Sequence, residues 1–269
     1  MDDIFCSDDG MIGMPDVQVD FFDGQQSALD NCAVNAEASL IRQFGYDLSE
    51  TEASYISAEH GWYMPGAGTS PNDVGNIMGL YDIETHTVTD ATVADLADEL
   101  AHGHGVIVGV KADDLWDQGP LQEICNFIYD AVGLDNSVTR PADHAIVVTG
   151  IDISDANNPM VLINDSGVPD GGAHAYPLDR FMDAWENSDF QYTATDSVLP
   201  SLAAQVDTPS WGDMCSDFLS AAIGVVAGVA NFFDSGDLED ALETGVTVAS
   251  GTSVILDALM NDDDFVRCI

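Results

Sequence analysis

The chain has 269 residues, 46% of them hydrophobic, and carries 48 aspartate and glutamate residues against 5 lysine and arginine residues, a net charge of −43 at pH 7. The hydrophobic content argues against a disordered acidic chain, and the charge argues against binding to DNA, RNA or an anionic membrane surface. Because so large a like charge opposes folding unless salt screens it, the composition indicates an acidic, halophilic protein from a high-salt organism.

Metal, cofactor and export signals are weak in this sequence. The five cysteines lie far apart, without a CxxC pair or a zinc-ligand spacing. The acidic run 262–264 lacks the ligand pattern of an EF-hand loop and is better explained as a solvated surface. We therefore expect no metal site and no cofactor. The acidic N-terminus lacks the basic and apolar regions of a signal peptide, so we expect a cytoplasmic protein.

The first regular element expected in chain order is a buried helix. Residues 1–24 are polar and rich in aspartate and glycine, which predicts a lead-in segment rather than a core element. Apolar residues at a spacing of about 3.6 then indicate a helix that begins at Cys32. Asp30 and Asn31 are its cap candidates, and Gly45 ends it.

Two more helices are expected before the first strand of the chain. One is predicted over 49–60, followed by a loop with glycine and proline over 62–68. Residues 69–73 have the pattern of a helix cap, a first-turn proline and an acidic first turn. They predict a third helix that runs to Leu80.

Strands dominate the next part of the chain. A short helix after Asp90 precedes a strand over 105–111, and an acidic, amphipathic insertion follows over 113–140. The apolar runs 145–151 and 160–163 are separated by turn residues, so they are expected to pair as an antiparallel hairpin.

A helix over 177–185 and a strand over 191–195 complete the expected elements of the main domain, residues 25–200. Helices first and antiparallel strands afterwards predict an α+β fold, with N-terminal helices packed on an antiparallel sheet.

The last part of the chain, residues 201–269, is expected to be a helical appendage. Two apolar segments, 218–233 and 244–256, are joined by an acidic turn. The first would be about 24 Å long as a helix, short of the roughly 30 Å of a bilayer core, so no membrane span is expected. The pair could instead bind the main domain, a partner or a second copy. Cys215 and Cys268 flank the unit, but sequence alone does not decide whether they form a disulfide.

Three residues of the expected α+β domain fit the requirements of thiol chemistry. The first turn of a helix stabilises a thiolate, and Cys32 is predicted to lie there. In the expected hairpin, the start of one strand lies beside the end of the other, which makes His144 and Asp165 neighbours. A histidine can activate the sulfur, and a carboxylate can orient the ring. Gln26, six residues before Cys32, could donate to an oxyanion together with the Cys32 backbone N–H.

The sequence resembles the bacteriocin-processing peptidases that cut double-glycine leaders, a family of papain-like cysteine peptidases. Three segments carry the resemblance: QSALDNCAV at 26–34, DHAIVV at 143–148 and INDSG at 163–167. It spans about residues 20–195 and implies a papain-like fold of the stand-alone form, without transporter domains.

The resemblance also implies the roles of the site residues: Cys32, His144 and Asp165 as a catalytic triad and Gln26 in the oxyanion hole. Asn164 competes with Asp165 for the orienting role, and Asp165 is preferred because the family uses that position. Ser166 departs from the proline that usually follows the aspartate, and Ala33 departs from the glycine that transporter-linked members have after the cysteine.

Three functions remain open at this point. The first is a thiol peptidase that acts on a peptide or protein and trims glycine-ended leaders. The second is a catalytically silent peptide-binding module on the same fold. The third is another amide hydrolase or acyl transferase with the same triad. Taken singly, Cys32 could be a core residue, His144 a strand-edge residue and Asp165 a turn residue.

Overall fold

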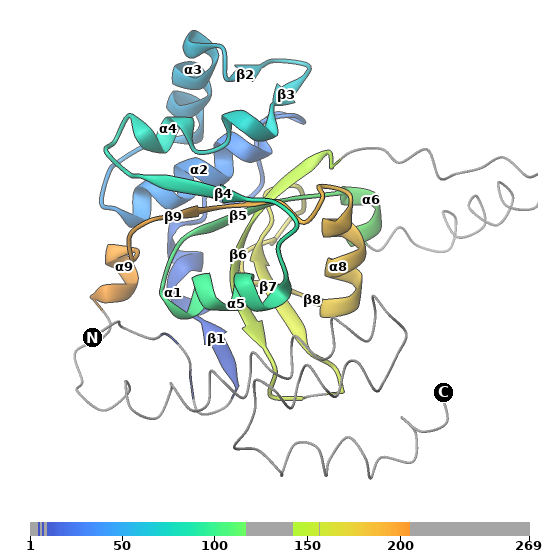
Figure 1. Ribbon diagram of the computed structural model, residues 1–269. Helices are drawn as coiled ribbons and strands as arrows, with labels where there is room; N and C mark the ends of the chain where they lie inside the picture. Colours follow the sequence, from blue (N-terminus) through green and yellow to red (C-terminus); the bar gives the residue numbers. More distant parts are fainter. Residues whose placement is uncertain (1–4, 6, 8–9, 117–141, 156, 205–269) are drawn as a thin grey trace, which may run out of the picture.

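The computed structural model describes residues 5, 7, 10–116, 142–155 and 157–204. They form an α+β fold in which helices pack on both sides of an antiparallel sheet (Figure 1). The fold class expected from the sequence is therefore confirmed. Most of the predicted insertion and of the predicted C-terminal helical appendage lies outside the described residues.

The sheet has seven strands within the described part of the chain, and all of its pairings are antiparallel. Six strands follow the order β4-β9-β5-β6-β7-β8, and β1 pairs with the far end of β6. The strands are β1 (Met11–Gly13), β4 (Thr85–Val88), β5 (Val106–Val110), β6 (His144–Asp152), β7 (Met160–Asn164), β8 (His174–Pro177) and β9 (Tyr192–Thr195). The expected hairpin of β6 and β7 is present. The short strands β4 and β8 were not anticipated.

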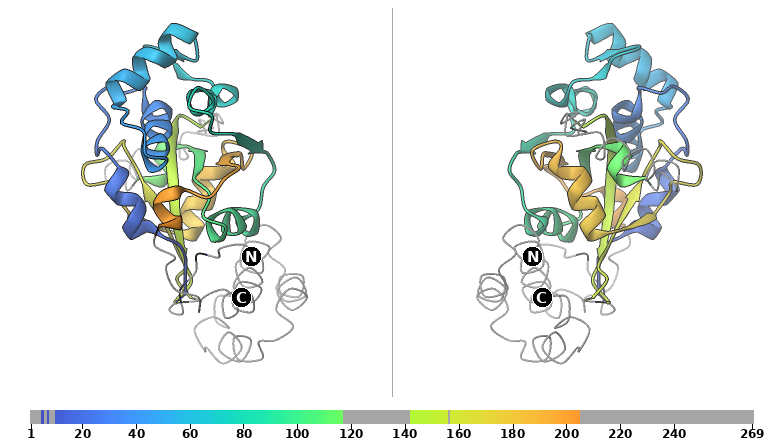
Figure 2. Two further views of the ribbon diagram at one scale, coloured as in Figure 1. Left: turned by 90° about the vertical axis from the view of Figure 1, so that its left-hand side faces the viewer. Right: turned by 90° about the vertical axis from the view of Figure 1, so that its right-hand side faces the viewer.

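Helices cover both faces of the sheet, which explains why its central strands are continuously apolar. Helix α2 (Cys32–Gln43) packs on one face, and α5 (Val93–Ala101) and α8 (Leu178–Glu186) pack on the other (Figure 2). Along β5, Ile107 joins the cluster around α2, whereas Val108 joins the cluster around α5 and α8. Successive side chains of a strand point to opposite faces, so both faces require apolar residues here.

The helix predicted to follow α2 is confirmed as α3 (Glu50–His60). Ser49 and Glu52 form a reciprocal capping box at its start, and Gly61 ends it in a left-handed conformation with a φ of 79°. The loop expected after it contains a two-stranded hairpin, β2 (Tyr63–Met64) and β3 (Gly68–Thr69).

The prediction of a single third helix that runs to Leu80 is wrong. The chain forms a 3-10 turn, η2 (Pro71–Asp73), and a separate short helix, α4 (Asn76–Gly79). Gly75 between them has a φ of 99°, and a Cβ atom on it would lie 2.7 Å from the Thr85 hydroxyl. From α2, the buried Glu37 carboxyl group accepts the Ile77 N–H at 3.0 Å. A tertiary contact therefore stabilises the restart of the helix at Asn76, and the local capping signal did not reveal it.

The N-terminal segment is more than a lead-in, which corrects the expectation for residues 1–24. Strand β1 extends the sheet, and Ile12 on it is fully buried. Helix α1 (Pro15–Gln18) and the turn η1 (Val19–Phe21) follow. Three strand residues are too few to show an alternating pattern, so this strand left no signal in the sequence.

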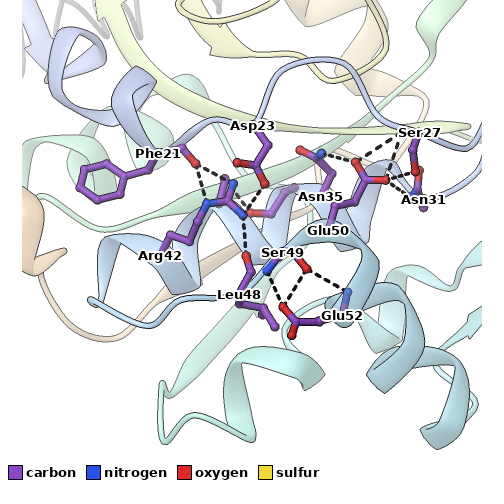
Figure 3. Close-up of polar contacts among 12 residues, drawn as sticks. Phe21, Asp23, Ser27, Asn31, Asn35, Arg42, Leu48, Ser49, Glu50 and Glu52 are labelled. Carbon is purple, nitrogen blue, oxygen red and sulfur yellow. Dashed lines mark hydrogen bonds and ion pairs between the residues drawn. The ribbon is translucent and has the colours of Figure 1, made fainter.

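One of the chain's few basic residues ties this segment to α2. Arg42 donates to the Phe21 carbonyl through Nε at 3.0 Å and Nη2 at 2.6 Å, and to the Leu48 carbonyl at 2.9 Å. It also pairs with Asp23 at 2.8 Å (Figure 3). The planar guanidinium has five N–H donors in a fixed geometry, so it can bind these acceptors at once.

Two further short helices complete the described chain, α6 (Ala112–Leu115) and α9 (Pro200–Ala203). None of the helices in the described residues is long and apolar enough to cross a membrane.

Candidate active site

Cys32 lies at the meeting point of the helical layer and the sheet. It is the first residue of α2, follows Asn31 at the N-cap position and is partly exposed. The backbone N–H of Ala145, at the start of β6, donates to the Cys32 sulfur at 3.4 Å. The sulfur therefore lies at the positive end of the helix dipole and also receives a donor from the sheet.

The structure brings His144 and Asp165 together. His144 opens β6, and Asp165 follows the last residue of β7. His144 Nε2 and Asp165 Oδ1 are 2.6 Å apart, and both side chains are buried. Because Nε2 is bound to the carboxylate, Nδ1 is the ring nitrogen left for Cys32. The antiparallel register of the hairpin thus turns a separation of 21 residues into a contact.

Further donors surround the Asp165 carboxylate. Trp116 Nε1 donates to Oδ2 at 2.8 Å, and the Gly167 backbone N–H donates to Oδ1 at 2.8 Å. The Tyr176 hydroxyl approaches Oδ2 at 3.5 Å. Burial alone would raise the pKa of Asp165, but the hydrogen bonds from His144, Trp116 and Gly167 lower it. The carboxylate therefore stays ionised and fixes the orientation of the ring.

The pKa values of Cys32 and His144 move in opposite directions. Burial would raise the pKa of the Cys32 thiol, but the hydrogen bond and charge of His144 and the N–H groups of Ala145 and Ala33 lower it. Burial would lower the pKa of His144, but its hydrogen bonds to Asp165 and Cys32 raise it to about 9. These shifts favour a thiolate beside an imidazolium at neutral pH.

Hydrogen bonds hold Gln26 between the loop that precedes Cys32 and the residues that follow β7. Its backbone N–H donates to the Ser166 carbonyl at 2.8 Å, and the Ser166 hydroxyl donates to Gln26 Oε1 at 2.9 Å. Its amide nitrogen donates to the Ala28 carbonyl at 2.7 Å. Ser166, which departs from the family's usual proline, therefore positions Gln26. The second N–H of the Gln26 amide is the one an oxyanion would need.

Asn164, the competitor for the orienting role, points elsewhere. Its side-chain oxygen accepts the Ala173 N–H at 2.9 Å, and its nitrogen donates to the Gln18 carbonyl at 3.4 Å. Neighbouring residues at the end of a strand face opposite sides, so only Asp165 reaches the histidine.

Sequence reasoning missed Trp116. Besides binding Asp165, its ring lies edge-on to His144, with centroids 5.3 Å apart. A Cβ atom on Gly167 would lie 2.4 Å from the indole, so this glycine makes room for the tryptophan. The tryptophan thereby covers the histidine–aspartate pair. Its contacts are 28 and 49 residues away in sequence, and no local pattern marks it.

Within the described residues, no group of three or more histidine, cysteine, aspartate or glutamate side chains could hold a metal ion. The described arrangement combines a sulfur at the start of a helix, an imidazole and a buried carboxylate. Such a set can carry out acyl transfer through a thioester.

The chain is similar to several known proteins. The sequence matches the model of the Peptidase_C39 like family over residues 18–193. Uncharacterised proteins of Mycobacterium tuberculosis and Mycobacterium bovis are each 34% identical over 200 residues, covering 64% of this chain and 79% of theirs. A solved structure from Bacillus anthracis, described as C39-like, aligns at a TM-score of 0.47 and 14% identity, covering 69% of this chain and 96% of that one.

Proposed function

The chain belongs to the Peptidase_C39 like family, and on that premise we propose that it is a cysteine peptidase whose nucleophile is Cys32. One observation carries the proposal: the sulfur at the head of α2 interacts with His144, whose other ring nitrogen is bound to the buried Asp165 at 2.6 Å. Its substrate is a peptide or a protein.

The proposed reaction follows from these contacts. The Cys32 thiolate adds to the carbonyl carbon of a peptide bond, and the resulting oxyanion accepts hydrogen bonds from the Cys32 N–H and the Gln26 amide. The His144 imidazolium gives its proton to the leaving amine nitrogen, and a thioester remains. Water then attacks the thioester while His144 takes its proton, and the released thiolate restores the ion pair. Asp165 keeps the ring oriented throughout.

A finer proposal concerns the substrate. We propose that this enzyme cleaves after glycine-ended leader segments, as in the bacteriocin-processing subgroup. The three motif segments around Gln26, His144 and Asp165 support this proposal. Ala33 departs from the subgroup's pattern next to the nucleophile, so substrate profiling with a peptide library should compare glycine with other residues before the cut.

We expect iodoacetamide to alkylate Cys32 selectively at pH 6 to 7. An ordinary thiol has a pKa of about 8.5 and is almost wholly protonated at pH 6. The thiolate–imidazolium pair is present between the lowered pKa of Cys32 and the pKa of about 9 of His144. The rate of Cys32 alkylation should therefore reach a plateau well below pH 8.5. Peptide mapping by mass spectrometry at several pH values, in molar KCl, measures it.

The chain's other cysteines, Cys6, Cys125, Cys215 and Cys268, are internal controls in the same sample. A second control is His144→Ala, which should return the Cys32 profile to that of an ordinary thiol. If Cys32 reacts no faster than the others at pH 6, the peptidase proposal fails and a silent peptide-binding module is favoured. Selective labelling together with cleavage of non-peptide amides alone would favour the other acyl-transfer function.

We also propose that the protein works at high salt concentration, because its charge is −43 and ion pairs of lysine or arginine between described residues are confined to Arg42–Asp23 and Lys111–Asp114. Raising KCl from 0.1 to 2 M shortens the Debye length from about 10 Å to below about 3 Å. We expect the midpoint of thermal unfolding to rise by roughly 10 °C, equivalent to about 3 kcal/mol. Sucrose at equal osmolarity is the control. A midpoint that does not respond to KCl, or responds equally to sucrose, contradicts the proposal.

A further inference from the structure

The loop that leads to the nucleophile is held by a carboxylate from a different helix. Glu50, the first residue of α3, lies beside residues 27–35, where it meets the loop and the first turn of α2 (Figure 3). The loop before α2 connects the two donors of the proposed oxyanion hole: Gln26 lies at its start, and the Cys32 N–H lies at its end. The inference drawn from this contact rests on the proposed peptidase function.

Glu50 accepts hydrogen bonds from three residues of this segment. Oε1 accepts the Ser27 backbone N–H at 3.1 Å and the Ser27 hydroxyl, as well as Asn31 Nδ2 at 2.6 Å. Oε2 accepts Asn35 Nδ2 at 2.9 Å. Burial would raise the pKa of Glu50, but these hydrogen bonds from Ser27, Asn35 and Asn31 lower it. An ionised carboxylate is an acceptor only, and every one of these partners is a donor.

Asn31 connects the Glu50 carboxylate to the active site. It immediately precedes Cys32 and is almost fully buried. Its side-chain nitrogen binds Glu50 and, at 3.4 Å, the Ser54 hydroxyl, whereas its buried oxygen has no partner among the described residues. Turning the amide over would place that oxygen against the Glu50 carboxylate. Glu50 therefore determines how the residue before the nucleophile is oriented.

Glu50 binds residues on both sides of Cys32 in the sequence. Ser27 follows Gln26, Asn31 precedes Cys32, and Asn35 lies about one turn further along α2. The Cys32 sulfur itself interacts with other groups, the His144 ring and the Ala145 N–H. The contact consequently bears on where the two oxyanion donors lie relative to each other, rather than on the ionisation of the thiol.

We propose that Glu50 is a positioning residue for the oxyanion hole, holding the Gln26 and Cys32 donors at the spacing that peptide cleavage requires. Oxyanion donors act only when they lie at hydrogen-bond distance from the developing charge. A displacement of about 1 Å in such a site can cost roughly 100-fold in rate. Alkylation of the thiolate by iodoacetamide forms no oxyanion, so it does not need this spacing.

The test compares acylation with alkylation in Glu50→Gln. The acylation probe is benzyloxycarbonyl-glycyl-glycine p-nitrophenyl ester: the sulfur forms a thioester and p-nitrophenolate leaves, which is recorded as a burst of absorbance. In Glu50→Gln, the side-chain NH2 group must face at least one of the donors. We expect the acylation rate to fall roughly 10- to 100-fold. The rate and pH profile of Cys32 alkylation should stay within about 2-fold of wild type, because the His144 ring and the Ala145 N–H still serve the thiolate.

The chain offers a matched control in Glu52→Gln. Glu52 lies on the same first turn of α3, binds Ser49 in the capping box and is exposed (Figure 3). This variant loses the same charge from the same turn, and we expect acylation at the wild-type rate. Equal losses in Glu50→Gln and Glu52→Gln would overturn the proposal, as would wild-type acylation in Glu50→Gln or a parallel loss of alkylation and acylation.

Two further measurements separate failure of the Glu50 proposal from failure of the peptidase proposal. If Glu50→Gln does not fold, Ser27→Ala decides, since it removes only one hydroxyl donor to Glu50. A fall in acylation of about 3-fold or more, with alkylation unchanged, supports the proposal, and unchanged acylation overturns it. The wild-type protein tests the function itself: if it shows neither selective alkylation of Cys32 nor a burst, the peptidase proposal fails, and the role of Glu50 fails with it.

Discussion

Replacing Cys32 by alanine is expected to abolish acylation and peptide turnover while the protein stays folded. Without the sulfur no thioester can form, and loss of a nucleophile typically costs 10⁴-fold or more, on the order of 10⁶ in a well-studied serine protease. The fold should tolerate the change because Cys32 is partly exposed and alanine favours a helix. The burst of p-nitrophenolate and the cleavage of a peptide library measure activity, and circular dichroism measures the fold.

The control for this variant is Cys6→Ala, which removes a thiol from the N-terminal segment and should retain activity. Binding of a peptide to Cys32→Ala, measured by isothermal titration, should persist, since the thiol is needed for the reaction and not for peptide binding. Activity of more than a few per cent of wild type in Cys32→Ala refutes the assignment of the nucleophile.

The elements that form the candidate site could be predicted because their signals are local. The start of α2 is marked by its apolar spacing and by a polar residue at the N-cap, and β6 and β7 are apolar runs around a turn. Once the hairpin is expected, the geometry of antiparallel pairing alone places His144 beside Asp165. The sequence thus contains enough to foresee the central contact of the site.

The groups that bind Asp165 and the loop before Cys32 could not be foreseen. Trp116 meets Asp165 across 49 residues, and Glu50 meets Ser27 across 23 residues. Such hydrogen bonds depend on tertiary packing, which no short pattern encodes. The broken third helix has the same origin, because a capping signal at Pro71 is local whereas the Glu37 carboxyl group that binds Ile77 comes from α2. Local patterns consequently located the groups proposed to react but not the residues that contact them.

The second large effect is expected for Asp165→Asn. Asp165 accepts hydrogen bonds on both oxygens, with His144 and Gly167 at one and Trp116 at the other. An asparagine must turn its NH2 group toward one of these sides. If it faces His144, Nε2 has to become the acceptor and the proton moves to Nδ1, where the ring can no longer take a proton from the sulfur.

The change of tautomer, or in the other orientation the loss of the charge that holds the ring and of the Trp116 hydrogen bond, should lower the acylation rate by about 10⁴-fold, the size seen when the triad aspartate of a serine protease becomes asparagine. The pKa of His144, now raised by the Asp165 hydrogen bond among other causes, should fall, and alkylation of Cys32 at pH 6 should slow to the rate of an ordinary thiol. Breaking a buried charged pair should also cost about 3 kcal/mol or more of unfolding free energy, which a denaturant titration measures.

Asp143→Asn is the matched control for this prediction. It removes the same charge next to His144 in sequence, but the Asp143 carboxylate binds the Ala112 N–H at 2.9 Å, away from the histidine pair. Its acylation rate and its alkylation profile should stay close to those of the wild type. If Asp165→Asn behaves like Asp143→Asn in both assays, the carboxylate does not orient the base. His144 would then act with Cys32 as a dyad, and the buried Asp165 would serve the fold alone.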